Sequence, residues 1–121
     1  MDCFCDYDPA DVYRASIVAH ARTRHTCSEC GRLITIGERY ERVFGVWEGD
    51  ANTFKTCSRC LDLRDFVASN VPCFCWAHGN IIEDAMETAE EYHEPGNGLL
   101  FGAYRRKVKI LRNERHEGSQ P

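Results

Sequence analysis

The residues of this chain best suited to chemistry are its eight cysteines, which fall into four close pairs: Cys3 with Cys5, Cys27 with Cys30, Cys57 with Cys60, and Cys73 with Cys75. Two thiolates two or three residues apart can chelate one metal ion, whereas a disulfide needs a separation and an orientation that close neighbours rarely meet. The pairing therefore predicts metal sites. Zinc is the expected metal, because tetrahedral four-thiolate sites suit it and it brings no redox chemistry. Disulfides and an iron centre are the alternatives.

The two inner pairs are expected to form one zinc site. Residues 27–31, Cys-Ser-Glu-Cys-Gly, have the pattern of a zinc knuckle, in which Gly31 lets the backbone turn so that its amides can face sulfur. Cys57 and Cys60 follow Cys30 after 26 intervening residues and would lie in the first turn of a helix. The positive end of that helix dipole favours the negative charge of four thiolates.

The residues around these ligands predict a hairpin followed by a helix. The expected elements are a strand over 38–47, a loop over 48–52, a returning strand over 53–56, and a helix with its N-cap at Ser58 and with Leu63, Phe66 and Val67 at helical spacing. Knuckle, hairpin and ligand-bearing helix, in that order, are the treble-clef arrangement. The expected fold class is therefore α+β: a small zinc-stabilised treble-clef zinc finger followed by two C-terminal helices.

The outer cysteine pairs flank this finger and repeat one tripeptide, Cys-Phe-Cys, at residues 3–5 and 73–75. Neither pair fills four coordination positions alone, so the simplest arrangement joins Cys3, Cys5, Cys73 and Cys75 in a second site, giving two Zn²⁺ per chain. His78 is a competing ligand for this site. Alternatively, His78 binds no metal and is a surface histidine or a neighbour of the ligands. Two independent sites completed by His20, His25 or His78 are the other possible pairing.

Two further helices are expected after the cysteines. The first spans 81–92 after an N-cap at Asn80, and its apolar face is Ile82, Ala85, Met86, Ala89 and Tyr92 or His93. The break at 94–98 contains proline and glycine. The second helix carries Leu100, Phe101, Tyr104, Val108 and Leu111 on one face.

These two helices differ in charge. Residues 83–94 carry six acidic side chains and no Lys or Arg. Residues 104–116 carry six basic ones, namely Arg105, Arg106, Lys107, Lys109, Arg112 and Arg115, against the single acid Glu114. In the simpler interpretation the helices are antiparallel and neutralise each other. In the alternative the basic helix contacts a phosphate backbone or an acidic protein face.

The chain is expected to divide into a double-zinc treble-clef domain at 1–80, a helical hairpin at 81–116 and a disordered tail at 117–121. Residues 8–24 are compatible with either a short helix or an extended segment.

Enzyme motifs are missing from the sequence. A treble-clef nuclease of the His-Asn-His type needs histidines on the hairpin and helix, and none of the five histidines lies there. Zinc deaminases need His-x-Glu and Pro-Cys-x-x-Cys, whereas residues 72–75 have the wrong spacing and no His-x-Glu occurs. No phosphate loop, nucleophile elbow or His-Glu-x-x-His is present. Since four-thiolate zinc is also coordinatively closed, we expect neither catalysis nor a small-molecule substrate.

Composition and charge exclude further classes of protein. The net charge of −4 argues against a protein whose whole surface clamps nucleic acid. No apolar run of about 18 residues occurs, so no membrane-spanning helix is expected. The acidic start of the chain differs from a secretory signal, which predicts a cytoplasmic, reducing location.

The cysteine core also resembles a known set of proteins. Residues 27–32, 36–40 and 54–60, extended back to 3–6 and forward through 73–79, are similar to small cysteine-rich proteins encoded by bacteriophages and prophages, most of which are uncharacterised. The resemblance covers most of the first 80 residues and leaves the C-terminal helices outside. It implies a phage origin and a treble-clef zinc fold, but it does not indicate any particular activity.

Two functions are therefore expected as alternatives. The first is a non-enzymatic protein that binds a host or phage protein. In this role it would inhibit a host machine such as a defence complex or a polymerase. The acidic residues 83–94 could imitate nucleic acid in that role. The second is a nucleic-acid-binding regulator that uses the basic helix as its phosphate-contacting surface.

Overall fold

A computed structural model of the chain describes Cys3, Cys5 and residues 9–119, with side chains through residue 112. Its elements in chain order are β1 (Val12–Val18), β2 (His25–Thr26), β3 (Leu33–Ile34), β4 (Tyr40–Trp47), β5 (Asp50–Cys57), α1 (Ser58–Asn70), α2 (Ile81–Glu91) and α3 (Leu99–Ser119). Antiparallel strands followed by three helices confirm the α+β class. None of the described helices has the length and apolarity needed to cross a bilayer.

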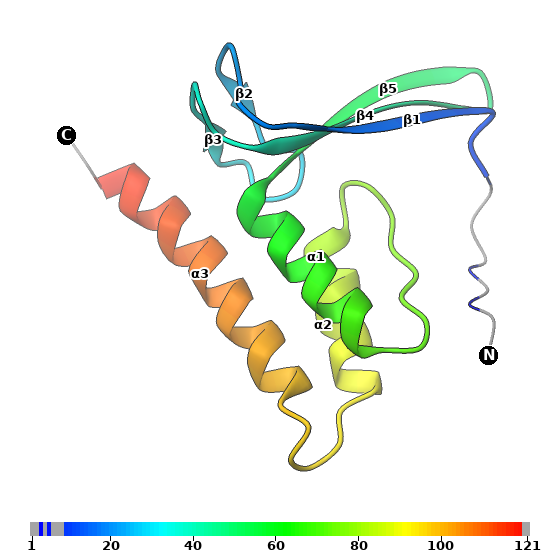
Figure 1. Cartoon of the computed structure of the whole chain (residues 1–121), viewed down its shortest axis with the longest axis vertical. Coiled ribbons are helices and arrows are strands. Elements are labelled where there is room, and N and C mark those ends of the chain that lie inside the picture. Colours follow the sequence, from blue (N-terminus) through cyan, green and yellow to red (C-terminus); the bar gives the residue numbers. More distant parts are fainter. Residues whose placement is uncertain (1–2, 4, 6–8, 120–121) are drawn as a thin grey trace.

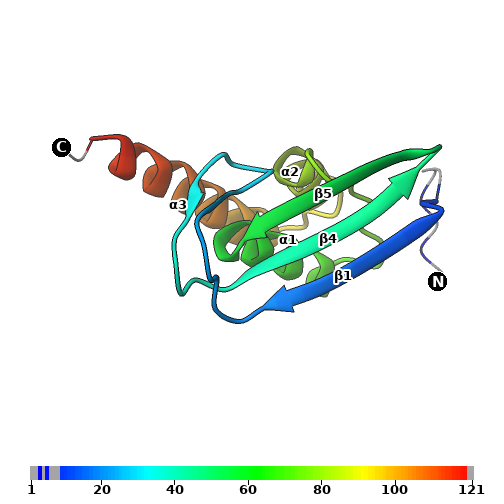
Figure 2. The same ribbon diagram turned by 90° about the horizontal axis from the view of Figure 1, so that it is seen from above.

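The molecule has two layers, a sheet and a group of helices (Figure 1). The sheet has the strand order β1-β4-β5, and β2 and β3 form a separate two-stranded ribbon. The three helices lie on one side of the sheet, and α1 packs against β4 and β5. Figure 2 looks onto the opposite side, where the three strands lie in front of the helices. His25 of β2 covers one end of this side, because its ring packs on Tyr40 and it bonds to Lys55.

The hairpin that joins β4 and β5 is tighter than the sequence predicted. Its turn is Glu48-Gly49, with φ of 50° and 86°, so both central residues are left-handed as in the two-residue turns that match strand twist. Trp47 and Asp50 are consequently register partners, and β5 begins at Asp50. The predicted loop over 48–52 and strand start at 53 were wrong because this short turn lets pairing begin at once.

The segment that the sequence left open is a strand. β1 pairs antiparallel with β4, from Val12 opposite Val46 to Val18 opposite Tyr40. Most β1 side chains are exposed, so its hydrogen bonds to β4, more than burial, keep it extended.

Helices α1 and α2 begin near the predicted residues. Cys57 is the N-cap of α1 and keeps extended dihedrals from β5, so the predicted N-cap Ser58 is already helical. Asn80 is the N-cap of α2, as predicted, although its side chain donates to Asp84 at 2.8 Å and leaves the helix amides alone. Both helices bury a stripe toward the core. The fully buried members are Cys60, Leu61, Leu63 and Val67 on α1 and Ile81, Ala85 and Ala89 on α2.

One continuous core joins the sheet end of the molecule to all three helices. It contains Cys27 and Tyr40 beside Leu63, Ala85 and Ile110. The boundary expected at residue 80 therefore lies within a single cluster of buried side chains.

Helix α3 packs with a different face from the one its apolar pattern indicated. Phe101, Tyr104 and Leu111 share a face, but they are 67%, 57% and 49% exposed. The buried stripe is Leu99, Ala103 and Ile110. Small residues decide this choice, because a Cβ at Gly102 would overlap the Phe66 ring and only a glycine lets α1 and α3 approach so closely.

The predicted neutralisation of α2 by α3 is not observed among the side chains that the structure describes. The ion pairs there are Arg32–Glu38, Arg64–Glu41, Arg64–Asp65 and Arg106–Asp62. The basic helix thus pairs with α1, and through residue 112 no cation of α3 pairs with an acid of α2. The helical state of α3 also continues to Ser119, beyond the expected end at 116.

Candidate metal centre

The inner cysteines form a compact central cluster. Cys27 and Cys30 come from the knuckle between β2 and β3, Cys57 ends β5, and Cys60 lies in the first turn of α1. The Cys27 and Cys60 sulfurs are 3.9 Å apart, and those of Cys30 and Cys57 are 3.8 Å apart. All four sulfurs lie within 4.8 Å of one another. Zn–S bonds of about 2.3 Å in a tetrahedron put sulfurs about 3.8 Å apart, so the cluster has the dimensions of a four-thiolate zinc site.

Backbone amides of the knuckle and of β5 point at the first sulfur. Glu29 N and Cys57 N donate to Cys27 Sγ at 3.4 and 3.3 Å. The turn closes through Gly31 N, which donates to the Cys27 carbonyl at 3.0 Å, and Gly31 has φ of +78°. These amides stabilise a thiolate at Cys27 independently of any bound cation.

The four thiols influence each other's ionisation in opposite directions. A hydrogen bond from Cys30 lowers the pKa of Cys27 to about 7. Hydrogen bonds from Cys27 and its neighbours also lower the pKa of Cys57. The pKa of Cys30 and the pKa of Cys60 are raised, in each case chiefly through a hydrogen bond with Cys27, so both thiols retain their protons. A divalent cation is what would displace those retained protons and let all four sulfurs bind as thiolates.

Arg32 places a buried positive charge beside this cluster. Its guanidinium forms a two-point ion pair with Glu38, at 2.7 and 3.3 Å. Burial lowers the pKa of Arg32, but hydrogen bonds with Glu38 and Cys57 outweigh that effect and raise it overall. The cation offsets part of the negative charge of four thiolates.

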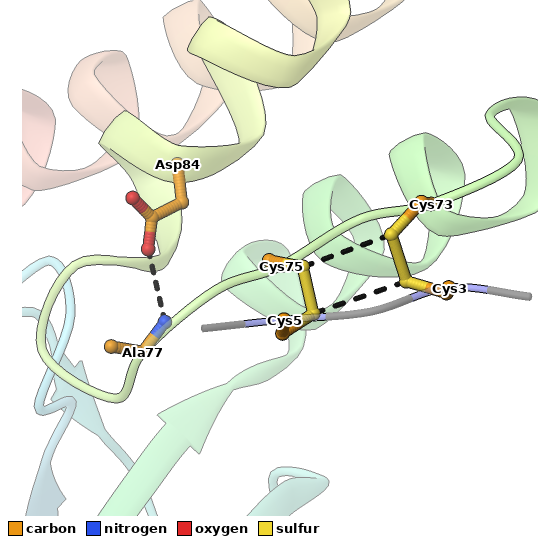
Figure 3. Close-up of a disulfide and its surroundings, with 6 residues drawn as sticks. All are labelled: Cys3, Cys5, Cys73, Cys75, Ala77 and Asp84. Carbon is orange, nitrogen blue, oxygen red and sulfur yellow. Dashed lines mark hydrogen bonds between the residues drawn. A yellow bond between two sulfur atoms is a disulfide. The ribbon is translucent and has the colours of Figure 1, made fainter. Parts of the chain in front are cut away.

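The outer cysteines come together as one cluster of four, which is the nested arrangement that the sequence predicted. All four sulfurs lie within 4.8 Å of one another. In the structure they are joined as two disulfides, Cys3–Cys73 and Cys5–Cys75 (Figure 3). Within each tripeptide the sulfurs are 3.9 Å apart for Cys3 and Cys5 and 3.7 Å apart for Cys73 and Cys75. The same four atoms could thus hold a metal ion when reduced.

The histidines proposed as substitute ligands lie elsewhere. His78 Nε2 is 2.9 Å from the Tyr13 hydroxyl, and its ring stacks on Phe54 at 4.7 Å. His25 bonds to Lys55 at 3.0 Å. His20 Nδ1 lies 3.3 Å from the Gly37 carbonyl. Because these rings are held by other partners, neither four-cysteine cluster includes them.

His78 belongs to an aromatic cavity of about 620 Å³ that sequence reasoning missed. Its aromatic walls are Tyr13, Trp47, Phe54, Trp76 and His78. These residues come from three strands and a loop, so only the pairing of β1 with β4 and β5 brings them together. Burial lowers the pKa of His78, and Arg64 lowers it further, although Glu41 raises it.

Glu29 is a second residue that sequence reasoning missed. Its carboxylate accepts hydrogen bonds from Gly79 N at 2.5 Å and Ile81 N at 2.8 Å. The knuckle therefore supplies the acceptor that α2 needs at its first turn, where amides have no helical partner. Nearby, Asp84 accepts from Ala77 N at 2.9 Å and ties the loop after the outer cluster to α2 (Figure 3).

The predicted basic surface of α3 is divided between two environments. Arg106 pairs with Asp62 at 3.3 Å, and its guanidinium lies 3.9 Å from the Phe66 ring centre. Arg105 and Lys109 are exposed, as is Arg112, and Lys107 is half-buried. A cavity of about 240 Å³ beside the start of α1 is lined by Ser58, Arg59, Asp62, Arg106 and Lys109. Arg115 lies outside the described side chains.

Comparison of the chain with protein-family models, curated proteins and solved structures finds no match. The resemblance to phage-encoded proteins therefore stays a prediction. What the structure does show is a small cysteine-rich protein with two four-cysteine clusters that could each bind a metal ion.

Proposed function

We propose that this chain is a zinc-stabilised binding protein of the treble-clef type, without catalytic activity. The observation that carries the zinc proposal is the central cluster, whose sulfurs are spaced at 3.8 and 3.9 Å and receive backbone amides. The treble clef is supported by the order of knuckle, β4–β5 hairpin and ligand-bearing helix α1. Zinc closes a loop that strands and one helix alone would hold weakly in so small a domain.

The absence of catalysis is supported by the coordination chemistry. Three of the four central cysteines are buried, and four thiolates fill a tetrahedral ion completely. A catalytic zinc needs an open position for water or substrate, which this donor set does not provide.

Metal content tests the two-zinc part of this proposal. We expect two zinc ions per chain when the protein is purified with a reductant, because the outer four sulfurs then bind as thiolates. Without a reductant we expect one zinc, with the outer cysteines as disulfides. Elemental analysis combined with thiol counting measures both. No zinc under reducing conditions would contradict the proposal, and one zinc under both conditions would restrict it to the central cluster.

The partner is proposed to be a protein, and the exposed apolar face of α3 supports this choice. Phe101 and Tyr104 expose more than half of their surfaces, and Leu111 is exposed beside them. Phe101 and Tyr104, together with Arg105 and Arg112, border a cavity of about 250 Å³. Aromatic residues with arginine are enriched in protein interfaces. The resemblance to phage proteins makes a host machine, such as a defence complex or a polymerase, the proposed target.

Affinity capture from host lysate tests this surface with a matched pair of variants. The double replacement Phe101→Ser with Tyr104→Ser should abolish capture of a protein that the wild-type chain retains. The double replacement Arg14→Ala with Arg42→Ala, on the sheet, should leave capture unchanged. Equal capture by all three proteins would contradict the assignment of α3 as the interface.

Nucleic-acid binding is the second candidate, and the basic cavity beside α1 favours it. Arg59 and Lys109 face a space that also borders the start of the helix, and no acid of α2 neutralises α3 among the described side chains. If this candidate is right, Arg105→Ala with Lys109→Ala weakens binding to all DNA sequences alike and lowers its salt dependence.

A further inference from the structure

The open face of the sheet has a charge pattern that the proposed function does not use. Side chains alternate across a strand, so every second residue of β1, β4 and β5 shares this face. The positions are Val12, Arg14, Ser16 and Val18 on β1, Tyr40, Arg42, Phe44 and Val46 on β4, and Ala51, Thr53, Lys55 and Cys57 on β5. Tyr40 and Cys57, at one end of this face, are buried, so the part open to a partner lies between them and the Glu48-Gly49 turn. Three of these side chains are cationic and none is acidic, in a chain whose net charge is −4.

The strand acids all belong to the other face, which packs on the helices. Glu41 is buried there and accepts two hydrogen bonds from Arg64 of α1, at 2.7 and 3.0 Å. Asp50 alternates with Asn52 and Phe54 and so shares the helix side. The separation of charge between the faces therefore follows from the strand register.

The three cations of the open face have no carboxylate partner among the residues that the structure describes. Arg14 and Arg42 are exposed and take part in none of the ion pairs found there. Lys55 donates to His25 Nδ1 at 3.0 Å, which is a neutral acceptor. Their charge is thus available to an anionic partner.

The cations surround one aromatic ring. Phe44 lies on the central strand, with Arg14 as its register partner on β1 and Thr53 on β5. Arg42 and Lys55 form the next pair across β4 and β5 on this face. Neighbouring strands are about 4.8 Å apart and successive same-face residues about 6.6 Å apart, so all three cations lie within reach of a chain crossing Phe44.

We propose that the open face of the β1-β4-β5 sheet binds a single-stranded polynucleotide, with Phe44 stacking a base and Arg14, Arg42 and Lys55 contacting phosphates. A single strand offers both parts of this match, a row of negative charges and unpaired aromatic bases. A duplex hides its base faces, and an acidic protein segment offers charge without stacking. The footprint of so small a sheet is roughly four nucleotides.

The proposal is tested by binding two labelled oligomers, a twelve-nucleotide oligothymidine and an oligouridine, to the zinc-loaded chain. With three phosphate contacts the logarithm of the binding constant should fall with the logarithm of salt at a slope of about −2. Fluorescence anisotropy at increasing salt measures this slope, and the two oligomers distinguish DNA from RNA. Failure to bind either oligomer at low salt overturns the proposal.

Two sets of variants separate this face from the rest of the surface. Arg14→Ala with Arg42→Ala should weaken binding by roughly tenfold and flatten the salt slope by about 1.4. Arg105→Ala with Lys109→Ala removes the same charge from α3, the surface of the second candidate function above, and on this proposal it weakens binding less than the sheet pair does. If the α3 pair has the larger effect, or if both pairs have the same effect, the sheet is not the binding site.

The stacking role of Phe44 is tested at constant apolarity. Phe44→Leu keeps an apolar side chain but removes the ring, and should weaken binding about fivefold or more, whereas Phe44→Trp should preserve it. Zinc content and thermal unfolding show that each variant is folded. Equal affinity of Phe44→Leu and wild type, or competition by duplex DNA or polyglutamate as strong as by the single strand, would show a purely electrostatic surface and overturn the proposal.

Discussion

Cys57 combines three roles in one residue. It is the last residue of β5, it is the N-cap of α1, and its sulfur belongs to the central cluster. Its amide also donates to Cys27 Sγ at 3.3 Å. A change at this position therefore acts on the sheet, on a helix start and on the proposed metal site together. Cys3, by contrast, is exposed and belongs to the outer cluster alone.

Replacing Cys57 by Ser should therefore be much more damaging than replacing Cys3 by Ser. The first should unfold the finger, because structural zinc contributes folding free energy on the order of 10 kcal/mol in small fingers. The second should remove only the outer link to Cys73. Circular dichroism on heating, with zinc analysis, measures the difference. Equal damage from both replacements would mean that the two clusters form one cooperative unit.

His78 should make stability depend on pH. Burial holds the folded-state pKa of His78 below 6.5, so the folded protein binds fewer protons than the unfolded chain and loses stability as the pH falls through and below 6.5. His78→Phe keeps the ring and removes this titration, so its unfolding free energy should fall less between pH 7 and pH 5. His93→Gln, at an exposed position, serves as the control. If the unfolding free energy of His78→Phe falls with pH as steeply as that of the wild type, His78 is not the source of the pH dependence.

At the scale of the elements, α3 shows how one helix can present two apolar faces of different use. The inward face is made of small and aliphatic residues, including Ala103 and Gly102, that fit against α1. The outward face carries larger rings, Phe101 and Tyr104. Large rings on the inward face would hold α1 and α3 apart, so packing favours the narrower stripe.

Among the basic residues of α3, Arg106 alone should matter for stability. Arg106→Ala removes an ion pair with Asp62 and a cation–π contact with Phe66, and should lower the free energy of unfolding by about 1–2 kcal/mol. Arg105→Ala and Lys109→Ala should each change it by less than about 0.5 kcal/mol. Chemical denaturation of the three variants tests this. Similar losses in all of them would indicate a charge network with α2 after all.

At the scale of the whole molecule, the strands with their central cysteine cluster and the C-terminal helices are joined into one body. The core cluster runs from Cys27 to Ile110 without interruption. Glu29 adds a polar link, because its carboxylate accepts hydrogen bonds from the backbone amides of Gly79 and Ile81 at the start of α2. The metal centre and the helix pair should consequently unfold together.

Glu29→Ala should loosen α2 without removing a metal ligand. Losing the acceptor for two helix-start amides should cost about 1–2 kcal/mol, and hydrogen exchange of the amides at 81–85 should accelerate. Glu29→Gln retains an oxygen acceptor and should recover much of the loss. Glu87→Ala, an exposed acid on α2, is the control. Unchanged exchange in Glu29→Ala would show that α2 is held by its apolar contacts alone.

The features that depend on local spacing could be predicted from the sequence alone. Two cysteines separated by one or two residues can reach the same ion, so the four pairs indicated metal sites, and two clusters of four were the simplest way to join them. The helices followed from their apolar period, and Asn80 marked the start of α2. The same short-range logic explains the error at β5, because it treated Glu48-Gly49 as part of a longer loop.

Features that depend on partners distant in the sequence arise only when the elements pack together. The strand β1 exists because β4 is there to pair with it, and that pairing creates both the aromatic cavity of His78 and the open face around Phe44. Which stripe of α3 is buried depended on the close approach that Gly102 allows to Phe66. Glu29 meets the first residue of α2 across 52 residues of chain. Such contacts arise from the packing of elements on one another, and the apolar pattern of a single element carries no information about which neighbour it will meet.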